Sequence, residues 1–201
     1  MSRILIASNN QGKLREFQAL LNDLKVELLT PAMLGIDIHV REEGKTYAEN
    51  ASLKGEVFAR ASGMITMADD SGLEVDVLGG LPGLHSARFA PEAGATDADR
   101  RNYLLRCLLG KPRPWVARFR SVLAVVIPGG KTHLAEGVCQ GEVVPKERGH
   151  HGFGYDPIFL IPELGKTMAE LTMDEKNRLS HRARAVRAVL PDLVNLLRDS
   201  T

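Results

Sequence analysis

The chain has 201 residues, of which 44% are hydrophobic and 25% are charged, and its formal net charge at pH 7 is +1. A chain of this size and balance is expected to fold as one domain, or as two lobes that share a core. Its charge excludes a strongly basic surface as the main means of binding nucleic acid or an anionic membrane, so any anion site must be local. No apolar segment is long enough for a membrane span or a secretion signal, and Cys107 and Cys139 lack metal-ligand spacing. We therefore expect a cytoplasmic protein with reduced thiols.

The first third of the chain alternates apolar runs with amphipathic segments. Residues 4–7 and 26–29 are predicted strands, and residues 12–24 form a predicted helix between them, because their apolar side chains recur on one face. Residues 46–60 are predicted to form a second helix. The apolar run at residues 64–68 predicts a buried strand that ends at the acidic residues after it.

Further along, a helix and then hairpin strands are predicted. A capping box at residues 96–99 opens a helix that ends at Gly110, which we interpret as a packing element only. Strands are then predicted at residues 115–119, 121–127 and 131–140, the last two joined by a hairpin. The fold class is therefore α/β, with a long mixed sheet flanked by helices. The tail, residues 182–198, has a helical pattern in which Pro191 should produce a kink or start a new helix.

Two adjacent carboxylates, Asp69 and Asp70, are the first candidate site residues. They follow the apolar run at residues 64–68, and a strand end is where open α/β sheets hold ligands. Neighbouring side chains on an extended backbone point to opposite faces, so only one of the two can face a given pocket. Carboxylates in such a place suggest a hard cation or a proton acceptor. The following Ser71 and Gly72 are equally typical of a simple polar turn.

A second candidate site is the junction between the first strand and the first helix. It contains Ser8, Asn9, Asn10, Gln11, Gly12 and Lys13. The free N–H groups and the positive end of a helix attract anions, and a triphosphate would suit them. The spacing matches neither the P-loop nor the dinucleotide fingerprint, and a capped helix with a polar lead-in is the alternative.

The third candidate lies at residues 153–157, in a glycine-rich segment with two aromatic side chains. Phe153 and Tyr155 flank Gly154 and offer a stacking face for a flat ring, and Asp156 can accept hydrogen bonds from a base. Such a loop is also common as plain packing. Lys176, His181 and Arg182 add cationic groups near a helix start, for which a solvated basic helix is the alternative.

Taken in chain order, these segments resemble the inosine triphosphate pyrophosphatase family, also called the dITP/XTP or non-standard purine nucleoside triphosphate pyrophosphatases. The resemblance spans essentially the whole chain. Its carriers are residues 8–13, Glu49-Asn50-Ala51 with Lys54, residues 68–73, residues 79–83, residues 153–157, and Glu175-Lys176 with Ser180-His181-Arg182. Many relatives have threonine where this chain has Ser8, so the hydroxyl is retained.

The resemblance implies magnesium-dependent hydrolysis of dITP, ITP and XTP between the α and β phosphates, which clears deaminated purines from the nucleotide pool. It implies that Asp70 accepts the proton of water and binds the metal, with Glu42 as the second metal ligand and Glu43 as its alternative. Lys54 would be a catalytic residue at the phosphates. The implied substrate-binding residues are Ser8, Asn9, Asn10, Gln11, Gly12, Lys13, Ser71, Phe153, Gly154, Tyr155, Asp156, Lys176, His181 and Arg182. The resemblance further implies two lobes with a nucleotide cleft between them, a homodimer, and a small-molecule nucleotide as the partner.

Two other hypotheses remain open at this point. A Maf-type nucleotide pyrophosphatase would share the architecture, but its serine-rich N-terminal loop is not found here. A non-catalytic nucleotide sensor could use the same pockets. Asp69 and Asp70 argue against a sensor, because a triphosphate gains little from nearby negative charge unless a metal lies between them.

Overall fold

The computed structural model describes residues 2–199. The chain divides into two compact units, each built from separate stretches of sequence. The first unit contains the residues up to Asp70, then Ser121–Gly137, and the residues from His181 onward. The second contains Ser71–Arg120 and Val138–Ser180.

Among the described residues, seven strands form one sheet in the order β2-β1-β3-β4-β5-β6-β7. The strands are β1 (Ser2–Ile6), β2 (Val26–Leu29), β3 (Thr66–Val75), β4 (Trp115–Val126), β5 (Thr132–Val143), β6 (Phe159–Ile161) and β7 (Lys166–Thr167). Strand β1 is parallel to β2 and β3, whereas β6 is antiparallel to β5 and β7. The predicted mixed sheet is confirmed.

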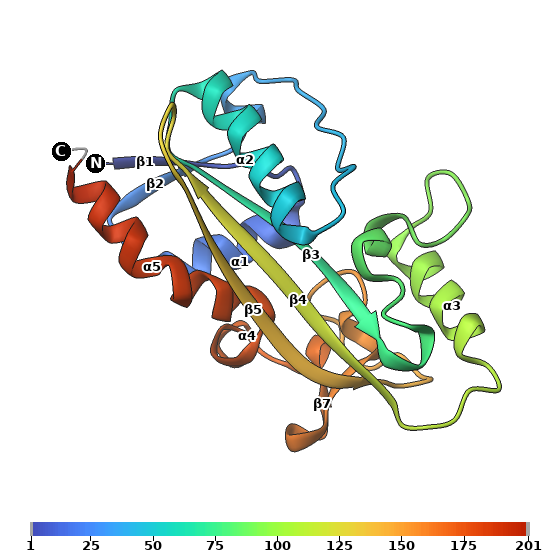
Figure 1. Ribbon diagram of the computed structural model, residues 1–201. Helices are drawn as coiled ribbons and strands as arrows, with labels where there is room; N and C mark the ends of the chain where they lie inside the picture. The colour runs from blue at the N-terminus through green and yellow to red at the C-terminus, as the bar shows by residue number, and fades with distance from the viewer. Residues whose placement is uncertain (1, 200–201) are drawn as a thin grey trace. The chain divides into compact units, whose positions relative to one another are not determined.

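Five α-helices are described, and Figure 1 labels them in chain order. They are α1 (Gln11–Leu20), α2 (Tyr47–Ser62), α3 (Asp97–Leu108), α4 (Met173–Leu179) and α5 (His181–Asp199). The predicted capping box at the start of α3 is present, since Thr96 and Asp99 bond to each other's backbone N–H groups. None of the helices among residues 2–199 is both long and apolar enough to cross a bilayer.

In the first unit, β1 separates two layers of helices because its side chains alternate between faces. Ile4 and Ile6 join a buried cluster with residues of α1 and α5, including Phe17. Leu5, on the opposite face, packs in a cluster with Phe58 of α2. Strand β3 repeats this alternation, with Met67 in the α1 and α5 cluster and Ala68 in the α2 cluster. The next two side chains of β3, those of Asp69 and Asp70, must therefore also point to opposite faces.

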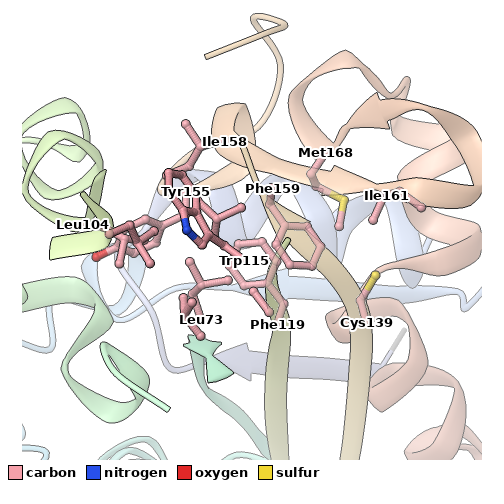
Figure 2. Close-up of a cluster of buried hydrophobic side chains, with 14 of the residues drawn as sticks. Leu73, Leu104, Trp115, Phe119, Cys139, Tyr155, Ile158, Phe159, Ile161 and Met168 are labelled. Carbon is pink, nitrogen blue, oxygen red and sulfur yellow. The ribbon is translucent and has the colours of Figure 1, made fainter. Parts of the chain in front are cut away.

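The core of the second unit gathers aromatic side chains from distant parts of the sequence (Figure 2). The rings of Phe119 in β4 and Phe159 in β6 lie 4.5 Å apart at their centroids. Leu104 of α3 is fully buried in the same cluster, as is Leu73 of β3. The predicted packing role of α3 is therefore confirmed.

Three predictions about element boundaries were wrong. Strand β3 continues to Val75, so Asp69 and Asp70 lie inside the strand rather than after it. Strand β4 is a single strand across Arg120, because Arg118 and Arg120 both occupy the polar positions of one alternating pattern and both bond to Glu74 of β3.

Of the two outcomes predicted at Pro191, the start of a new helix is wrong and the kink stays a prediction. Helix α5 contains Pro191 in its interior, and no second helix begins there. Its apolar face continues on both sides of the proline, with Val189 and Leu193 in one buried cluster. That packing outweighs the single backbone hydrogen bond that proline removes. Helix α1 is the third wrong boundary, because it is shorter than predicted and ends at Leu20.

Candidate active site

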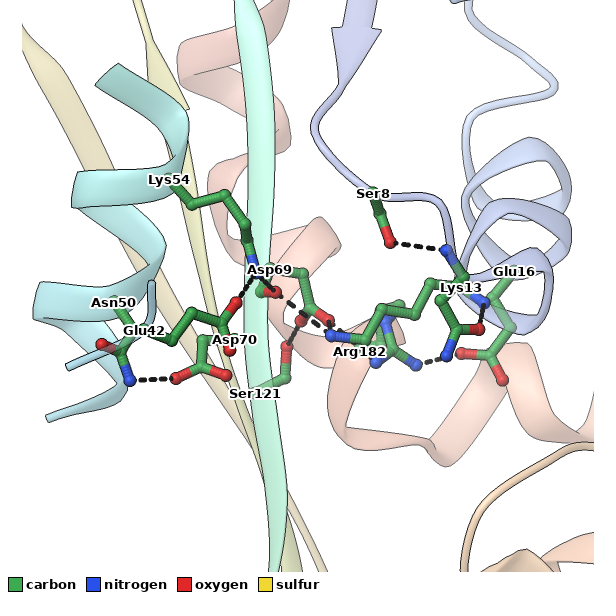
Figure 3. A network of polar contacts seen from close by, with 11 residues as sticks. Ser8, Lys13, Glu16, Glu42, Asn50, Lys54, Asp69, Asp70, Ser121 and Arg182 are labelled. Carbon is green, nitrogen blue, oxygen red and sulfur yellow. Dashed lines mark hydrogen bonds and ion pairs between the residues drawn. The ribbon is translucent and has the colours of Figure 1, made fainter. Parts of the chain in front are cut away.

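Asp69 and Asp70 lie on opposite faces of β3 and contact different helices (Figure 3). Asp69 follows Met67 onto the face covered by α1 and α5, and Asp70 follows Ala68 onto the face covered by α2. Both are buried, with exposed fractions of 2% and 6%. The alternation predicted for the two carboxylates is confirmed, and it gives each a different chemical environment.

Asp69 is surrounded by donors. Its Oδ2 atom lies 2.9 Å from Nη2 of Arg182 and 2.7 Å from Nζ of Lys13, and Oδ1 accepts a hydrogen bond from the Ser121 hydroxyl. Arg182 also donates to Glu16 of α1. Burial alone would raise the pKa of Asp69, but the charges of Arg182 and Lys13 and the donated hydrogen bonds hold it well below its usual range. Asp69 is thus ionised at neutral pH, within a buried ion cluster.

Asp70, in contrast, accepts a hydrogen bond from the neutral side chain of Asn50. Nδ2 of Asn50 donates to Asp70 Oδ2 at 2.9 Å, and Oδ1 of Asn50 accepts the Gly44 N–H at 2.7 Å. A Cβ at Gly44 would lie 2.6 Å from that Asn50 oxygen, so only glycine allows this close approach. Burial, with the nearby negative charge of Glu42, raises the pKa of Asp70 above its usual value despite the bond from Asn50. A carboxylate of raised pKa is suited to accepting a proton.

Two lysines converge on the backbone between these carboxylates. Nζ of Lys54 lies 2.9 Å from the carbonyl oxygen of Asp69, and Nζ of Lys13 lies 3.1 Å from the same atom. Lys54 also forms an ion pair with Glu42 at 2.5 Å. Burial lowers the pKa of Lys13; the charges of Lys54 and Arg182 act in the same direction, while Asp69 opposes them. Two ammonium groups thus meet at one carbonyl oxygen, while each is also paired with a carboxylate.

The loop that opens α1 lies beside this cluster. Oδ1 of Asn10 caps the helix by accepting the N–H of Lys13 at 3.1 Å, and the Ser8 hydroxyl accepts the N–H of Asn10 at 3.2 Å. Asn9 and Gln11 are exposed and Gly12 is buried. The predicted junction of a strand, a polar loop and a helix start is therefore present, with Lys13 directed from it toward Asp69.

The second unit holds the other group of predicted residues. Asp156 and Lys176 form a buried ion pair of 2.6 Å, in which each side chain is 5% exposed. Asp156 also accepts the N–H of Phe153 at 2.9 Å, and Nζ of Lys176 lies 5.3 Å from the centroid of the Phe153 ring. Phe153, Asp156 and Lys176 are thus brought together as predicted, although 20 residues separate the two members of the ion pair.

The profile of the Ham1 family matches residues 4–192 of this chain. The chain belongs to the Ham1 family. A dITP/XTP pyrophosphatase of Geobacillus kaustophilus is 49% identical over 187 residues, which cover 92% of this chain and 91% of that protein. Another from Thermus thermophilus is 46% identical and covers 94% of this chain and 90% of its own length. A solved HAM1 protein from Coxiella burnetii has a TM-score of 0.86 and 36% identity, covering 97% of this chain and 100% of that one.

In this Ham1 family member, the remaining predicted site residues differ in burial and in bonding partners. The Tyr155 hydroxyl donates to the carbonyl of Ser86 at 2.9 Å in the core, so its ring is packed rather than exposed for stacking. Its burial raises the pKa of the hydroxyl well above its usual value. His181 and Arg182 are buried at the start of α5, and Arg182 is bound to carboxylates in the first unit. Ser71 is half-buried in β3.

Three residues that contact the site residues of the first unit were not predicted as candidate site residues. Asn50 belongs to a motif segment, so that motif was an available signal. Glu16 directly precedes Phe17, which was predicted on the apolar face of this helix, so its position beside that face could have suggested a buried ion pair. Ser121, in β4, carries no signal that separates it from other strand residues.

The chemistry of Glu42 and Asp70 fits the magnesium ion that the sequence led us to expect. Glu42 and Asp70 are close enough for one to raise the pKa of the other. Magnesium is commonly bound by one or two carboxylates, while substrate phosphates and water fill the remaining positions. Within the described part of the chain, no group of three or more acidic, histidine or cysteine residues has metal-binding geometry. Glu43, by contrast, has a side chain that is 76% exposed and lies 3.9 Å from Arg41.

Proposed function

We propose that this chain hydrolyses dITP, ITP and XTP to the nucleoside monophosphate and pyrophosphate, and so clears deaminated purines from the nucleotide pool. Curated relatives named dITP/XTP pyrophosphatase, which align with 92% to 94% of the chain, support this substrate class. The structural observation that carries the proposal is Asp70, a buried carboxyl group of raised pKa beside Glu42 and near two lysines.

In this proposal Asp70 removes a proton from the attacking water. Its raised pKa brings its basicity closer to neutral pH, which favours proton transfer in the transition state. Asp69 is a poor candidate for the same role, because Arg182 and Lys13 stabilise its ionised form and lower its proton affinity. Asp69 would instead hold Lys13 in place.

The phosphates would be bound by Lys54, Lys13 and the start of α1. Ammonium groups and helix N–H groups are complementary to phosphate oxygens and stabilise the charge that builds up on the leaving pyrophosphate. The ligands proposed for magnesium are Asp70 and Glu42. When bound, the ion would offset negative charge on the phosphates and the leaving group. Lys54, which pairs with Glu42, would then exchange that contact for phosphate oxygens.

The base would be recognised by residues 153–156 and Lys176, with Ser71 and His181 as further substrate contacts. Hypoxanthine and xanthine carry a 6-oxo acceptor, which a lysine ammonium can satisfy. Adenine has a 6-amino donor at that position, which offers the ammonium no acceptor. Arg182 was predicted to contact the base, but its pairing with Glu16 and Asp69 favours an indirect role in holding α1 against α5.

We also propose a homodimer and a cytoplasmic location, for which the resemblance to the inosine triphosphate pyrophosphatase family is the support. Light scattering of the purified protein tests the first, and cell fractionation tests the second. A monomer at micromolar concentration, or recovery of the protein with membranes, would contradict them.

Phosphorus NMR of the protein with ITP and magnesium tests the proposed reaction, because it identifies both the products and the bond that is cleaved. We expect IMP and pyrophosphate, with ATP and GTP hydrolysed at least ~100-fold more slowly, equivalent to about 3 kcal/mol. Orthophosphate as the first product would contradict cleavage between the α and β phosphates. Turnover of other nucleotides alone would favour a Maf-type enzyme, and binding without turnover would favour a sensor.

A further inference from the structure

The loop around Phe153 and Asp156 is rich in glycine, so its backbone can adopt conformations that other residues disfavour. Gly149, Gly152 and Gly154 all have positive φ angles, of +83°, +80° and +61°. Glycine adopts this region easily but loses more conformational freedom than other residues when it is ordered. A loop of this composition has a defined shape only where other groups hold its backbone.

Helix α3 holds this loop at Gly154 through both backbone polar groups of that residue. The N–H of Gly154 donates to Oδ2 of Asp97 at 2.7 Å, and its carbonyl accepts from Nη1 of Arg101 at 2.8 Å. Asp97 and Arg101 are four residues apart on α3, so their side chains share one face of the helix. We call Asp97 and Arg101 the Gly154 clamp.

The clamp residues are themselves held by ion pairs. Arg101 makes a two-point contact with Glu147, with Nε to Oε1 at 2.8 Å and Nη2 to Oε2 at 3.0 Å. Asp97 pairs with Arg100 on the same helix. Burial would raise the pKa of Asp97, but the hydrogen bonds from Arg100 and the Gly154 N–H lower it below its usual value, so the carboxylate is ionised at neutral pH. Bidentate and charge-assisted contacts of this kind restrict the orientation of both side chains.

Gly154 lies between Phe153, which belongs to the proposed base site, and Tyr155, which is packed in the core. On one side, Phe153 donates its N–H to Asp156 and presents its ring to Lys176. On the other side, Tyr155 is anchored in the core through Ser86. A shift of the Gly154 peptide would therefore move Phe153 relative to the Asp156–Lys176 ion pair, while the anchored Tyr155 would stay in place.

We infer that Asp97 and Arg101 are positioning residues that set purine selectivity by holding Gly154 between Phe153 and Asp156. This inference rests on the proposed function, because it assumes that residues 153–156 receive the base. It adds a role to α3, which the sequence indicated only as a packing helix. The clamp residues bond to Gly154, and Arg101 also to Glu147, so their loss should weaken base recognition without altering the chemical step.

Steady-state kinetics of Asp97→Ala and Arg101→Met with ITP and ATP test the inference. We expect KM for ITP to rise about tenfold, equivalent to ~1.4 kcal/mol, with kcat nearly unchanged. The preference for ITP over ATP should fall by a similar factor. Arg101→Lys should recover part of the loss, since its ammonium can still donate to one acceptor but cannot bind Gly154 and Glu147 in the same planar arrangement.

Two variants on the same helix serve as matched controls. Asp99→Ala removes the capping box with Thr96, and Arg106→Met removes a cation that lies over the Tyr103 ring. Asp99→Ala should lower the stability of α3 and Arg106→Met should change it little, yet both should leave KM for ITP unchanged. An increase of KM in Asp99→Ala equal to that in Asp97→Ala would overturn the inference, because general loosening of α3 would then explain it.

Hydrogen exchange at the Gly154 amide provides a readout that needs no turnover. Exchange should be about tenfold faster in Asp97→Ala than in the wild type, since the amide loses its acceptor, and it should be unchanged in Arg106→Met. Unaltered exchange and KM in Asp97→Ala and Arg101→Met would overturn the clamp. If either clamp variant fails to fold, Arg101→Lys decides by the same two measurements. Failure of the proposed function is recognised separately, as absence of ITP hydrolysis by the wild-type protein.

Discussion

Asp69 and Asp70 are adjacent in β3, yet each accepts a hydrogen bond from a different helix. Nη2 of Arg182 in α5 donates to Asp69, and Nδ2 of Asn50 in α2 donates to Asp70, both at 2.9 Å. The cationic donor lowers the pKa of Asp69, whereas burial, with the nearby charge of Glu42, leaves the pKa of Asp70 raised. Asp69 is therefore suited to stabilising the fold through ion pairs, and Asp70 is suited to accepting a proton.

Asp70→Asn should abolish nearly all ITP turnover and leave a folded protein. A positioned base is typically worth ~100-fold to 10,000-fold in rate, and loss of a metal ligand should place the variant at or beyond the upper end. The asparagine also removes a buried charge that burial already disfavours, so stability should not fall. Measurement of kcat at saturating magnesium, with thermal melts alongside, checks both parts. A variant that keeps a tenth of the activity would refute the assignment of Asp70 as the base.

Asp69→Asn should have the opposite profile at neutral pH, with a larger loss of stability and a smaller loss of activity. It leaves Arg182 and Lys13 without their shared carboxylate, and breaking a buried ion pair costs about 3–5 kcal/mol. For a chain of this size, 3 kcal/mol corresponds to a decrease in Tm of about 6–12 °C. Calorimetry of the two single variants beside the wild type measures the difference.

The same ion cluster predicts a pH dependence. The folded-state pKa of Asp69 lies below its unfolded value of about 3.9. Its contribution to stability is therefore complete above that unfolded value and is lost as the pH falls toward the folded one. The gap in Tm between wild type and Asp69→Asn should be widest near neutral pH and narrow as the pH falls below about 4. A gap that stays constant down to the acid limit would contradict this account.

The opposite orientation of Asp69 and Asp70 was predictable, since it follows from the period of two in any strand. The sequence could not show where β3 ends, because Asp, Ser and Gly favour turns and only tertiary packing of Leu73 and Val75 keeps the strand extended. Pairs such as Arg182 with Glu16 were also beyond prediction. They join residues 166 positions apart, and only the fold brings them together.

Resemblance to a family located Phe153, Asp156 and Lys176, but it did not separate contact residues from supporting ones. Tyr155 shows the difference, because its place beside Gly154 suggested stacking and its hydroxyl is bonded to Ser86 in the core. An aromatic residue next to glycine has the same sequence pattern whether it contacts a substrate or packs in the core. Burial decides between them, and burial is a property of the folded chain.

Arg182→Met should destabilise the protein strongly, by ~3 kcal/mol or more, because Glu16 and Asp69 would remain buried without their shared cation. Arg187→Met is the matched control, since Arg187 is exposed on the same helix and surface substitutions usually change stability by about 0.5 kcal/mol or less. Urea unfolding of both variants measures the contrast. If Arg182→Met keeps wild-type stability and raises only KM for ITP, the guanidinium contacts the base instead.

Glu42→Gln should raise the magnesium concentration needed for half-maximal activity, whereas Glu43→Gln should leave it unchanged. Glu42 has a side chain that is 29% exposed and influences Asp70 directly, whereas that of Glu43 is 76% exposed beside Arg41. Loss of one of two carboxylate ligands should weaken metal binding by about tenfold or more. Magnesium titrations of both variants with ITP at saturation test the choice. A larger effect at Glu43 would reverse it.

Replacing both members of the Asp156–Lys176 pair should cost less stability than the two single substitutions cost together. The two side chains are 2.6 Å apart and each is 5% exposed, so Lys176→Met leaves a buried carboxylate and Asp156→Asn leaves a buried ammonium. Each single variant should lose ~3 kcal/mol, and the double variant should lose less than the sum, with a coupling of about 1–3 kcal/mol.

Activity should not return with stability, because the double variant still lacks the ammonium proposed to meet the 6-oxo group. Urea unfolding and ITP kinetics on all four proteins separate the two effects. Additive losses of stability would show that the pair is not coupled, and recovery of ITP selectivity in the double variant would remove Lys176 from the proposed base site.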